Sequence, residues 1–130
     1  MNLYLGIKFH EDLSNKTLID KICNIAEKES HKIKCVHRDL EDWGNIQFEL
    51  DELMINTFKI IDNSDAVIIE FSERGVGTGI EAGYAVAKGI PVYIFIQKGK
   101  KLSPTMKGIC KKCYVYENDI DIINIFKNMK

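Results

Sequence analysis

Apolar residues follow two alternating periods along the chain, which predicts strands and helices in turn. Short uninterrupted apolar runs are typical of buried strands, and apolar residues three or four apart are typical of helices that face a core. The predicted strands are 2–7, 33–37, 66–71, 92–96 and 114–116. The predicted helices are 12–30, 48–61, 80–88, 103–109 and 119–128. Five alternating units predict one α/β domain over residues 1–130, with an open parallel five-stranded sheet flanked by helices, as in flavodoxin-like and Rossmann-like folds.

Local signals support several of these boundaries. Ser14 is a candidate N-cap for the first helix, and the turn residues of 62–65 end the second one. Glu70 alone interrupts the apolar run of the third strand, so we expect that strand to lie in the centre of the sheet.

Composition agrees with a single globular domain and excludes several classes of function. The chain has 130 residues, of which 45% are hydrophobic and 28% charged. Its 18 basic and 19 acidic residues give a net charge of -1, so no overall field attracts a nucleic acid polymer or a membrane surface. The sequence has neither a membrane-length apolar run nor a signal-peptide pattern, and we expect a cytoplasmic protein.

Four cysteines raise the question of disulfides and metal. Free thiols are favoured because a chain of this length and apolar content needs no covalent staples. Cys110 and Cys113 have the spacing of a zinc knuckle, and Cys35 with His37 could complete a ligand set. One such pair without a second pair at fixed spacing is a weak signal, so we expect no metal and no cofactor.

Candidate chemistry lies in the segment 72–84, after the third predicted strand. Ligands of open parallel sheets bind beyond the carboxyl ends of the strands. Gly75, Gly77 and Gly79 let backbone amides approach a ligand there, although their spacing matches neither a dinucleotide fingerprint nor a P-loop. Glu81 follows in the predicted first helical turn, where it either projects into a site or complements the helix dipole.

Three segments carry a resemblance to a known family. Asp65-Ala-Val-Ile-Ile-Glu70, Gly75-Val-Gly-Thr-Gly-Ile-Glu81-Ala-Gly-Tyr84-Ala85 and Lys88-Gly-Ile-Pro91-Val92 resemble the nucleoside 2-deoxyribosyltransferases. This family includes a hydrolytic branch, the 2'-deoxynucleoside 5'-monophosphate N-glycosidases. The likeness runs from Leu3-Tyr4-Leu5-Gly6 to Gly108, and the short chain and the loop at Ser103 look closest to the hydrolytic branch.

The resemblance implies roles for individual residues. Glu81 matches the glutamate that attacks the anomeric carbon of the sugar, and Tyr4 matches a tyrosine that contacts and orients that nucleophile. Ser103 and Lys107 match a loop that contributes to 5'-phosphate binding across a subunit interface; Ser103 could equally cap the helix that follows, and Lys107 could be a surface charge. The implied partners are a small nucleoside or nucleotide and a second copy of the chain, in a homodimer or higher oligomer with shared sites.

Further candidates for substrate binding surround these positions. Gly6 belongs to the matched first strand, and Lys8 follows it in a loop at the same edge of the predicted sheet. Gly77 and Gly79 belong to the glycine segment. Gly75 stands where the transferases have an acidic residue and the hydrolases a serine, and the neighbouring Arg74 could compensate for a lost phosphate contact.

One departure from the family bears on the mechanism. The family places an aspartate eight residues before the aspartate that opens the third strand, and counting back from Asp65 reaches Thr57. Threonine is no general acid at neutral pH, so expulsion of the base must rely on another group or on a base that leaves without full protonation.

Three other functions compete with hydrolysis of a nucleoside 5'-monophosphate. A deoxyribosyltransferase would move the sugar to a second base. A phosphoribohydrolase of the cytokinin-activating type shares the Gly-Thr and the glutamate, but its Pro-Gly-Gly is replaced here by Arg74-Gly75-Val76-Gly77. A non-catalytic nucleotide-sensing module would keep the pocket without turnover.

Overall fold

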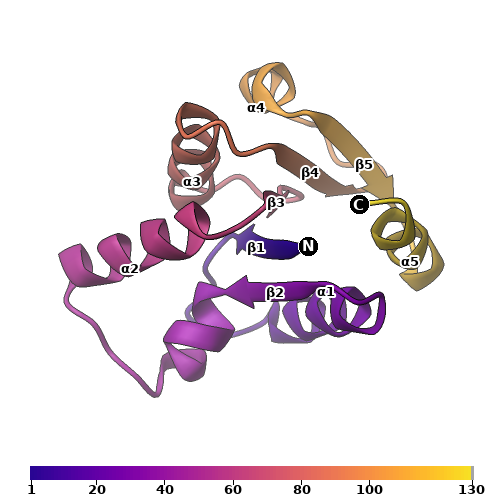
Figure 1. The fold of residues 1–130 in the computed structure, drawn as a ribbon. Coiled ribbons are helices and arrows are strands. Elements are labelled where there is room, and N and C mark those ends of the chain that lie inside the picture. The colour runs from indigo at the N-terminus through magenta and orange to yellow at the C-terminus, as the bar shows by residue number, and fades with distance from the viewer. Residues whose placement is uncertain (130) are drawn as a thin grey trace.

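The computed structural model describes residues 1–129. Its five strands are β1 (Asn2–Ile7), β2 (Lys32–Cys35), β3 (Ala66–Glu70), β4 (Val92–Gln97) and β5 (Lys112–Tyr116). They form one sheet in the order β2-β1-β3-β4-β5, and every neighbouring pair is parallel. The α/β fold with an open parallel sheet is therefore confirmed, and β3 lies at the centre as expected (Figure 1).

Helices cover both faces of this sheet, since parallel strands need crossover connections. They are α1 (Lys16–Lys28), α2 (Leu50–Asp62), α3 (Val76–Ala87), α4 (Pro104–Ile109) and α5 (Asp119–Asn128). In Figure 1, α1 and α5 lie on one side of the sheet and α2 and α3 on the other. Two short turns, Val36–Leu40 and Asp42–Gly44, lie between β2 and α2.

The core consists of two apolar layers that the sheet separates. Alternate residues of a strand point to opposite faces, so Leu3 and Leu5 of β1 pack toward α1 and α5, while Tyr4 packs toward α2, α3 and α4. All five residues of β3 are buried, which is typical of a central parallel strand. Tyr4 therefore lies in the middle of β1, on the face that α3 covers.

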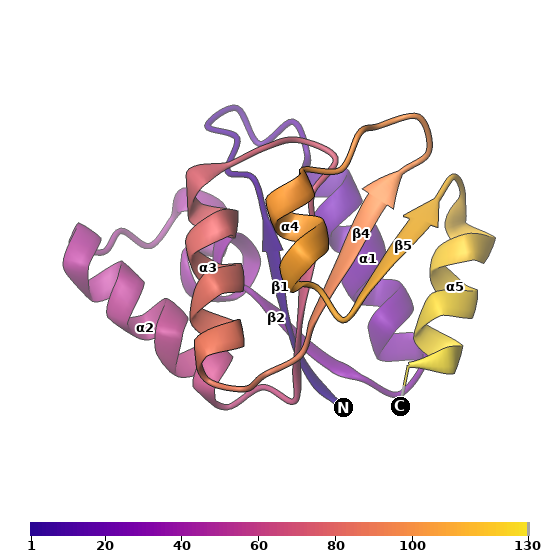
Figure 2. The same cartoon turned by 90° about the horizontal axis from the view of Figure 1, so that it is seen from above.

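The carboxyl ends of the strands meet at one edge of the molecule. Figure 2 shows the arrows of β1, β4 and β5 pointing the same way, toward the loops that lead into the next helices. The register pairs Ile7 of β1 with Glu70 of β3, and Glu70 with Phe95 of β4. Residues just after these positions therefore lie close together at this edge.

Several predicted boundaries differ from the structure, and three of these differences concern candidate residues or caps. α3 begins at Val76 instead of Ile80, so Gly77 and Gly79 are helical and Glu81 lies in the second turn. The early start is possible because extended Gly75 is the N-cap and Thr78 donates its hydroxyl to the Gly75 carbonyl at 2.9 Å.

The other two corrections concern α1 and β2. α1 begins at Lys16, and Ser14 does not cap it because its hydroxyl contacts His10 Nδ1 at 2.6 Å. β2 ends at Cys35, so His37 lies in the π-helical turn that follows and not in a strand. Within residues 1–129, none of the helices has the length and apolar character needed to cross a membrane.

Candidate active site

Glu81 and Tyr4 form a buried pair at the centre of the candidate site. Glu81, on α3, is 8% exposed, and Tyr4, on β1, is 1% exposed. The Tyr4 hydroxyl donates a hydrogen bond to Glu81 Oε2. The contact expected from the family resemblance is therefore present, and it fixes the direction in which the carboxylate points.

The two groups shift each other's proton affinity. Burial raises the pKa of Glu81 to about 7, although the hydrogen bond from Tyr4 partly opposes this because it favours the charged carboxylate. Burial and then the charge of Glu81 raise the pKa of Tyr4 well above its ordinary value. The tyrosine consequently keeps its proton, and Glu81 is the member of the pair that ionises near neutral pH.

Gly6 is required for the close approach of β1 to this carboxylate. A Cβ atom at Gly6 would lie 2.8 Å from Ile69 Cδ1 and 2.9 Å from Glu81 Oε1, closer than carbon atoms normally come to either. Gly6 thus makes room for the Glu81 side chain, two residues along β1 from the tyrosine that binds it.

Among the hollows at the carboxyl edge of the sheet, three lie close to the candidate residues. The first, which we call the Glu81 hollow, has a volume of about 90 Å³; its lining includes Tyr4, Cys35, His37, Thr57 and Glu81. The second, the Trp43 hollow, has a volume of about 240 Å³; its lining includes Phe9, His37, Glu41, Trp43 and Ile46. The third, the Lys8 hollow, has a volume of about 150 Å³; its lining includes Lys8, Glu70, Glu73, Gln97 and Lys100.

Thr57 occupies the wall of the Glu81 hollow, where the family has an aspartate. It is 2% exposed, and its hydroxyl donates to the Leu53 carbonyl one turn earlier in α2 at 2.8 Å. The proton of the hydroxyl is therefore directed into the helix backbone and away from the hollow.

The predicted binding residues of the loop after β1 and of the glycine segment differ in their surroundings. Lys8 lies beside Gly75, since a Cβ at Gly75 would come within 3.5 Å of Lys8 Cγ, and its ammonium group is 3.9 Å from the Glu73 carboxylate. Arg74 is exposed, and Gly77 contributes to the lining of the Glu81 hollow. Gly79 donates its amide to the Gly75 carbonyl at 3.3 Å, so this amide serves the helix and not a ligand.

Ser103 and Lys107 lie apart from these hollows within one chain. Ser103 is the N-cap of α4 and accepts a hydrogen bond from the Met106 amide at 3.5 Å, as one of its two expected roles requires. Lys107 is exposed on the same helix. Neither residue lines the Glu81 hollow.

Comparison with known families identifies the fold and its relatives. The profile of the nucleoside 2-deoxyribosyltransferases matches residues 3–126. The chain belongs to the nucleoside 2-deoxyribosyltransferase family. Members of this family are enzymes that act on nucleosides or nucleotides, and a search of curated protein sequences found no match.

Solved structures share the fold of this family member at low sequence identity. CMP N-glycosidase BcmB from Clostridium botulinum is 14% identical over 96% of each chain, with a TM-score of 0.70. The 2-deoxyribosyltransferase of Bacillus psychrosaccharolyticus is 16% identical, and the match covers 95% of this chain and 91% of the other, with a TM-score of 0.77. A conserved protein from Enterococcus faecalis is 14% identical over 100% and 99%, with a TM-score of 0.71.

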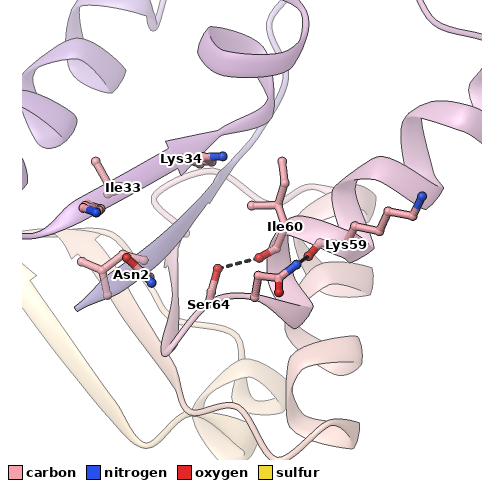
Figure 3. A pocket seen from close by; sticks show the side chains of 9 residues that line it. Asn2, Ile33, Lys34, Lys59, Ile60 and Ser64 are labelled. Carbon is pink, nitrogen blue, oxygen red and sulfur yellow. Dashed lines mark hydrogen bonds between the residues drawn. The ribbon is translucent and has the colours of Figure 1, made fainter.

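A larger cavity of this deoxyribosyltransferase-family chain lies at the other edge of the sheet. It has a volume of about 520 Å³ and opens where β1 and β2 begin, beside the end of α2 (Figure 3). Lys34 and Lys59 line it together with Asn2 and Ser64, whose hydroxyl donates to the Ile60 carbonyl at 2.7 Å. Its lining contains no carboxylate, and in parallel sheets the carboxyl edge is the usual place for ligands, so the Glu81 hollow remains the candidate.

A buried carboxylate, Glu70, is the centre of a hydrogen-bond network that the sequence did not predict. It ends β3 and accepts hydrogen bonds from the Ser72 amide at 2.6 Å, the Ser72 hydroxyl at 2.8 Å and the Tyr116 hydroxyl. The Ser72 hydroxyl in turn accepts from the Gln97 amide at 2.9 Å. This network ties the loop before α3 to β4 and β5. A charged residue within an otherwise apolar strand was the signal that pointed to it.

The four cysteines carry free thiols. Cys23 and Cys35 are buried, whereas Cys110 and Cys113 are partly exposed. Among the described residues, no three His, Cys, Asp or Glu side chains are grouped closely enough to hold a metal ion.

Proposed function

We propose that this protein hydrolyses the N-glycosidic bond of a nucleoside 5'-monophosphate, with Glu81 as the nucleophile. The observation that carries the proposal is the buried Glu81 carboxylate, held by the Tyr4 hydroxyl beside a hollow at the carboxyl edge of the sheet. A carboxylate in this position stabilises the oxocarbenium-like transition state and can capture the sugar covalently. The likeness to a CMP N-glycosidase supports a nucleotide substrate.

The reaction would proceed in two balanced steps. In the first, a Glu81 oxygen forms a bond to the anomeric carbon while the bond from that carbon to the base nitrogen breaks, and the electron pair leaves with the base. In the second, water attacks the anomeric carbon and releases the sugar phosphate and the Glu81 carboxylate. The Tyr4 hydroxyl would donate its hydrogen bond to Glu81 in both steps. This bond is stronger when Glu81 is a free carboxylate than when it is esterified, because a charged acceptor binds the donor more tightly.

A second copy of the chain would complete the site. The Glu81 hollow is about 90 Å³, well below the roughly 300 Å³ at which ordinary ligand sites begin. The outer face of α3 offers a surface for that copy, since Val76 is 82% and Ile80 48% exposed, and Gly79 and Gly83 face open space. Glu81, which is buried, is the only charged residue of α3. An exposed apolar patch of this kind is typical of a surface that binds another protein.

The partner would also supply phosphate contacts. Ser103 and Lys107 do not line the Glu81 hollow of their own chain, which supports the expectation that they reach the site of the neighbouring subunit. Lys8 and Arg74 are the candidates for phosphate contacts from the same chain. Their alanine variants should weaken the binding of monophosphates but not of nucleosides; equal weakening of both would reject a phosphate role.

Base release from a substrate panel tests the proposed activity. Purified protein is incubated with ribo- and deoxynucleosides and their 5'-monophosphates, with and without a second base as acceptor, and free base and new nucleoside are followed by chromatography. We expect free base from a monophosphate, and no release by Glu81→Gln. Glu29→Gln, at the residue that follows α1 and outside all three hollows, is the control carboxylate variant and should retain activity.

Other outcomes would support the competing functions. A new nucleoside formed only with an acceptor base would indicate a transferase. Tight nucleotide binding without release from any substrate would indicate a sensing module and would contradict the hydrolase proposal.

A further inference from the structure

Departure of the base needs a proton donor that the family aspartate cannot supply here. When the glycosidic bond breaks, the electron pair remains on the base, and a base that receives a proton leaves more easily. Thr57 stands at the aspartate position with its hydroxyl proton bound to a backbone carbonyl. A side chain that assists departure of the base must therefore be sought elsewhere in the site.

The lining of the Glu81 hollow contains four titratable side chains, and three of them are unsuited. The Tyr4 hydroxyl already donates a hydrogen bond to Glu81. Burial raises the pKa of Cys35 to about 12, so its thiol is a poor acid at neutral pH. Glu81 is the proposed nucleophile and must be ionised. The fourth is His37.

We propose that His37 is the general acid that protonates the departing base, a role that rests on the proposed glycosidase function. His37 is the one residue that lines both the Glu81 hollow and the Trp43 hollow. A ligand with its anomeric carbon beside Glu81 and its base beside the aromatic rings of Phe9 and Trp43 would place its glycosidic bond next to this imidazole. The rings of His37 and Phe9 already lie 5.2 Å apart between centroids.

Both nitrogens of the imidazole face oxygen atoms. Nδ1 lies 3.3 Å from Glu41 Oε1, and Nε2 lies 3.3 Å from the carbonyl oxygen of Ile7. These oxygens are hydrogen-bond acceptors, so a hydrogen bond at either nitrogen requires a proton on that nitrogen.

The charged side chains that line the two hollows are carboxylates. Glu11 and Glu41 line the Trp43 hollow and Glu81 lines the Glu81 hollow, and neither lining contains a lysine or arginine. The Lys16 ammonium group lies nearby, 4.9 Å from the centroid of the Trp43 ring.

The proton then follows a closed cycle. His37 Nε2 transfers its proton to the base as the bond from the anomeric carbon to the base nitrogen breaks, and its hydrogen bond to the Ile7 carbonyl is given up. The products of this step are neutral His37, the neutral free base and the sugar esterified to Glu81. In the second step the neutral imidazole takes a proton from the attacking water, so the Glu81 carboxylate and protonated His37 are both restored. Glu41 holds the Nδ1 proton throughout.

The test compares two leaving groups in the full-length protein. One substrate is the nucleoside 5'-monophosphate that the panel identifies, and the other is the 4-nitrophenyl glycoside of the same sugar 5-phosphate, whose nitrophenolate leaves without a proton. We expect His37→Asn to lower kcat/KM on the nucleotide by about 100-fold or more, as loss of a general acid does. It should leave kcat/KM on the nitrophenyl glycoside nearly unchanged, because kcat/KM reports the step in which the leaving group departs and not the later attack of water. Glu81→Gln should abolish both reactions.

Two further variants complete the design. Glu41→Gln, which leaves the imidazole in place but weakens its hold on the Nδ1 proton, should show a smaller loss with the same dependence on the leaving group. His10→Asn is the matched control, because His10 also contacts a carboxylate, Glu73 Oε1 at 2.9 Å, but lines neither hollow. It should retain activity on both substrates.

Each alternative result is decisive. Equal losses of kcat/KM on both substrates for His37→Asn and Glu41→Gln would assign His37 a structural role and overturn the proposal. Release that depends on Glu81 but not on His37 would overturn it while leaving the proposed function intact. Absence of release from either substrate by the unaltered protein would overturn both.

Discussion

Replacement of Glu81 by glutamine should make the protein more stable while it removes the proposed activity. Glutamine has the shape of the neutral glutamic acid and can still accept the Tyr4 hydrogen bond. Each pKa unit corresponds to about 1.4 kcal/mol, so a pKa raised from 4.5 to about 7 means that ionised Glu81 costs the fold about 3 kcal/mol. The glutamine variant avoids that cost.

The sign of the effect depends on pH. Because the folded state holds the proton of Glu81 more tightly than the unfolded state, the stabilising contribution of Glu81 is complete below about pH 4.5 and is lost as the pH rises through about 7. We therefore expect Glu81→Gln to match the parent near pH 4.5 and to exceed its free energy of unfolding by up to about 3 kcal/mol above pH 8.

Urea unfolding at a series of pH values measures this difference directly. Comparison of the variant with its parent at each pH cancels the contributions of all other titrating groups. Glu29→Gln, in which a partly exposed carboxylate at the end of α1 is replaced, is the control and should change the free energy of unfolding by less than about 0.5 kcal/mol at any pH. A constant difference between Glu81→Gln and the parent across the pH range would refute the argument that burial raises the pKa of Glu81.

Three other predictions concern the surroundings of Glu81. The value of kcat/KM should rise with pH through about 7 as Glu81 ionises. Tyr4→Phe should move the midpoint of this rise to higher pH, because the hydrogen bond that lowers the pKa of Glu81 is lost, and an unchanged midpoint would contradict the role of Tyr4. Gly6→Ala, by inserting a Cβ 2.8 Å from Ile69 Cδ1, should cost about 1–3 kcal/mol in urea unfolding and lower kcat, and a fully active variant of unchanged stability would contradict the steric argument. Ser72→Ala should cost about 1–3 kcal/mol in thermal unfolding, because it removes one donor from a buried carboxylate and leaves the Gln97 amide without its acceptor.

The order of elements could be predicted because burial imposes a clear pattern on this sequence. Strand β3 is apolar over nearly its whole length since both of its faces are covered, and the helices repeat their apolar residues at intervals that face the sheet. The start of α3 was misplaced because glycine is a poor guide to helix ends. Gly77 and Gly79 disfavour a helix locally, yet extended Gly75 and the Thr78 hydroxyl start one there.

The candidate site was predictable only in part. Glu81 could be singled out from its glycine-rich segment, and Tyr4 from its match to the family. The pairing of His37 with Glu41 could not, since it depends on a π-helical turn after β2 that no simple hydrophobic period describes. The bonds of Glu70 likewise depend on the register that brings Tyr116 of β5 beside the loop after β3.

Detection of a sugar phosphate bound to Glu81 would test the central claim most directly. Protein mixed with the nucleoside 5'-monophosphate identified by the panel is quenched in acid within one turnover, and its intact mass and proteolytic fragments are measured. The account predicts a mass increase equal to one sugar phosphate on the fragment that contains Glu81, and none in Glu81→Gln. Base release at the normal rate by Glu81→Gln, with no adduct in either protein, would contradict it.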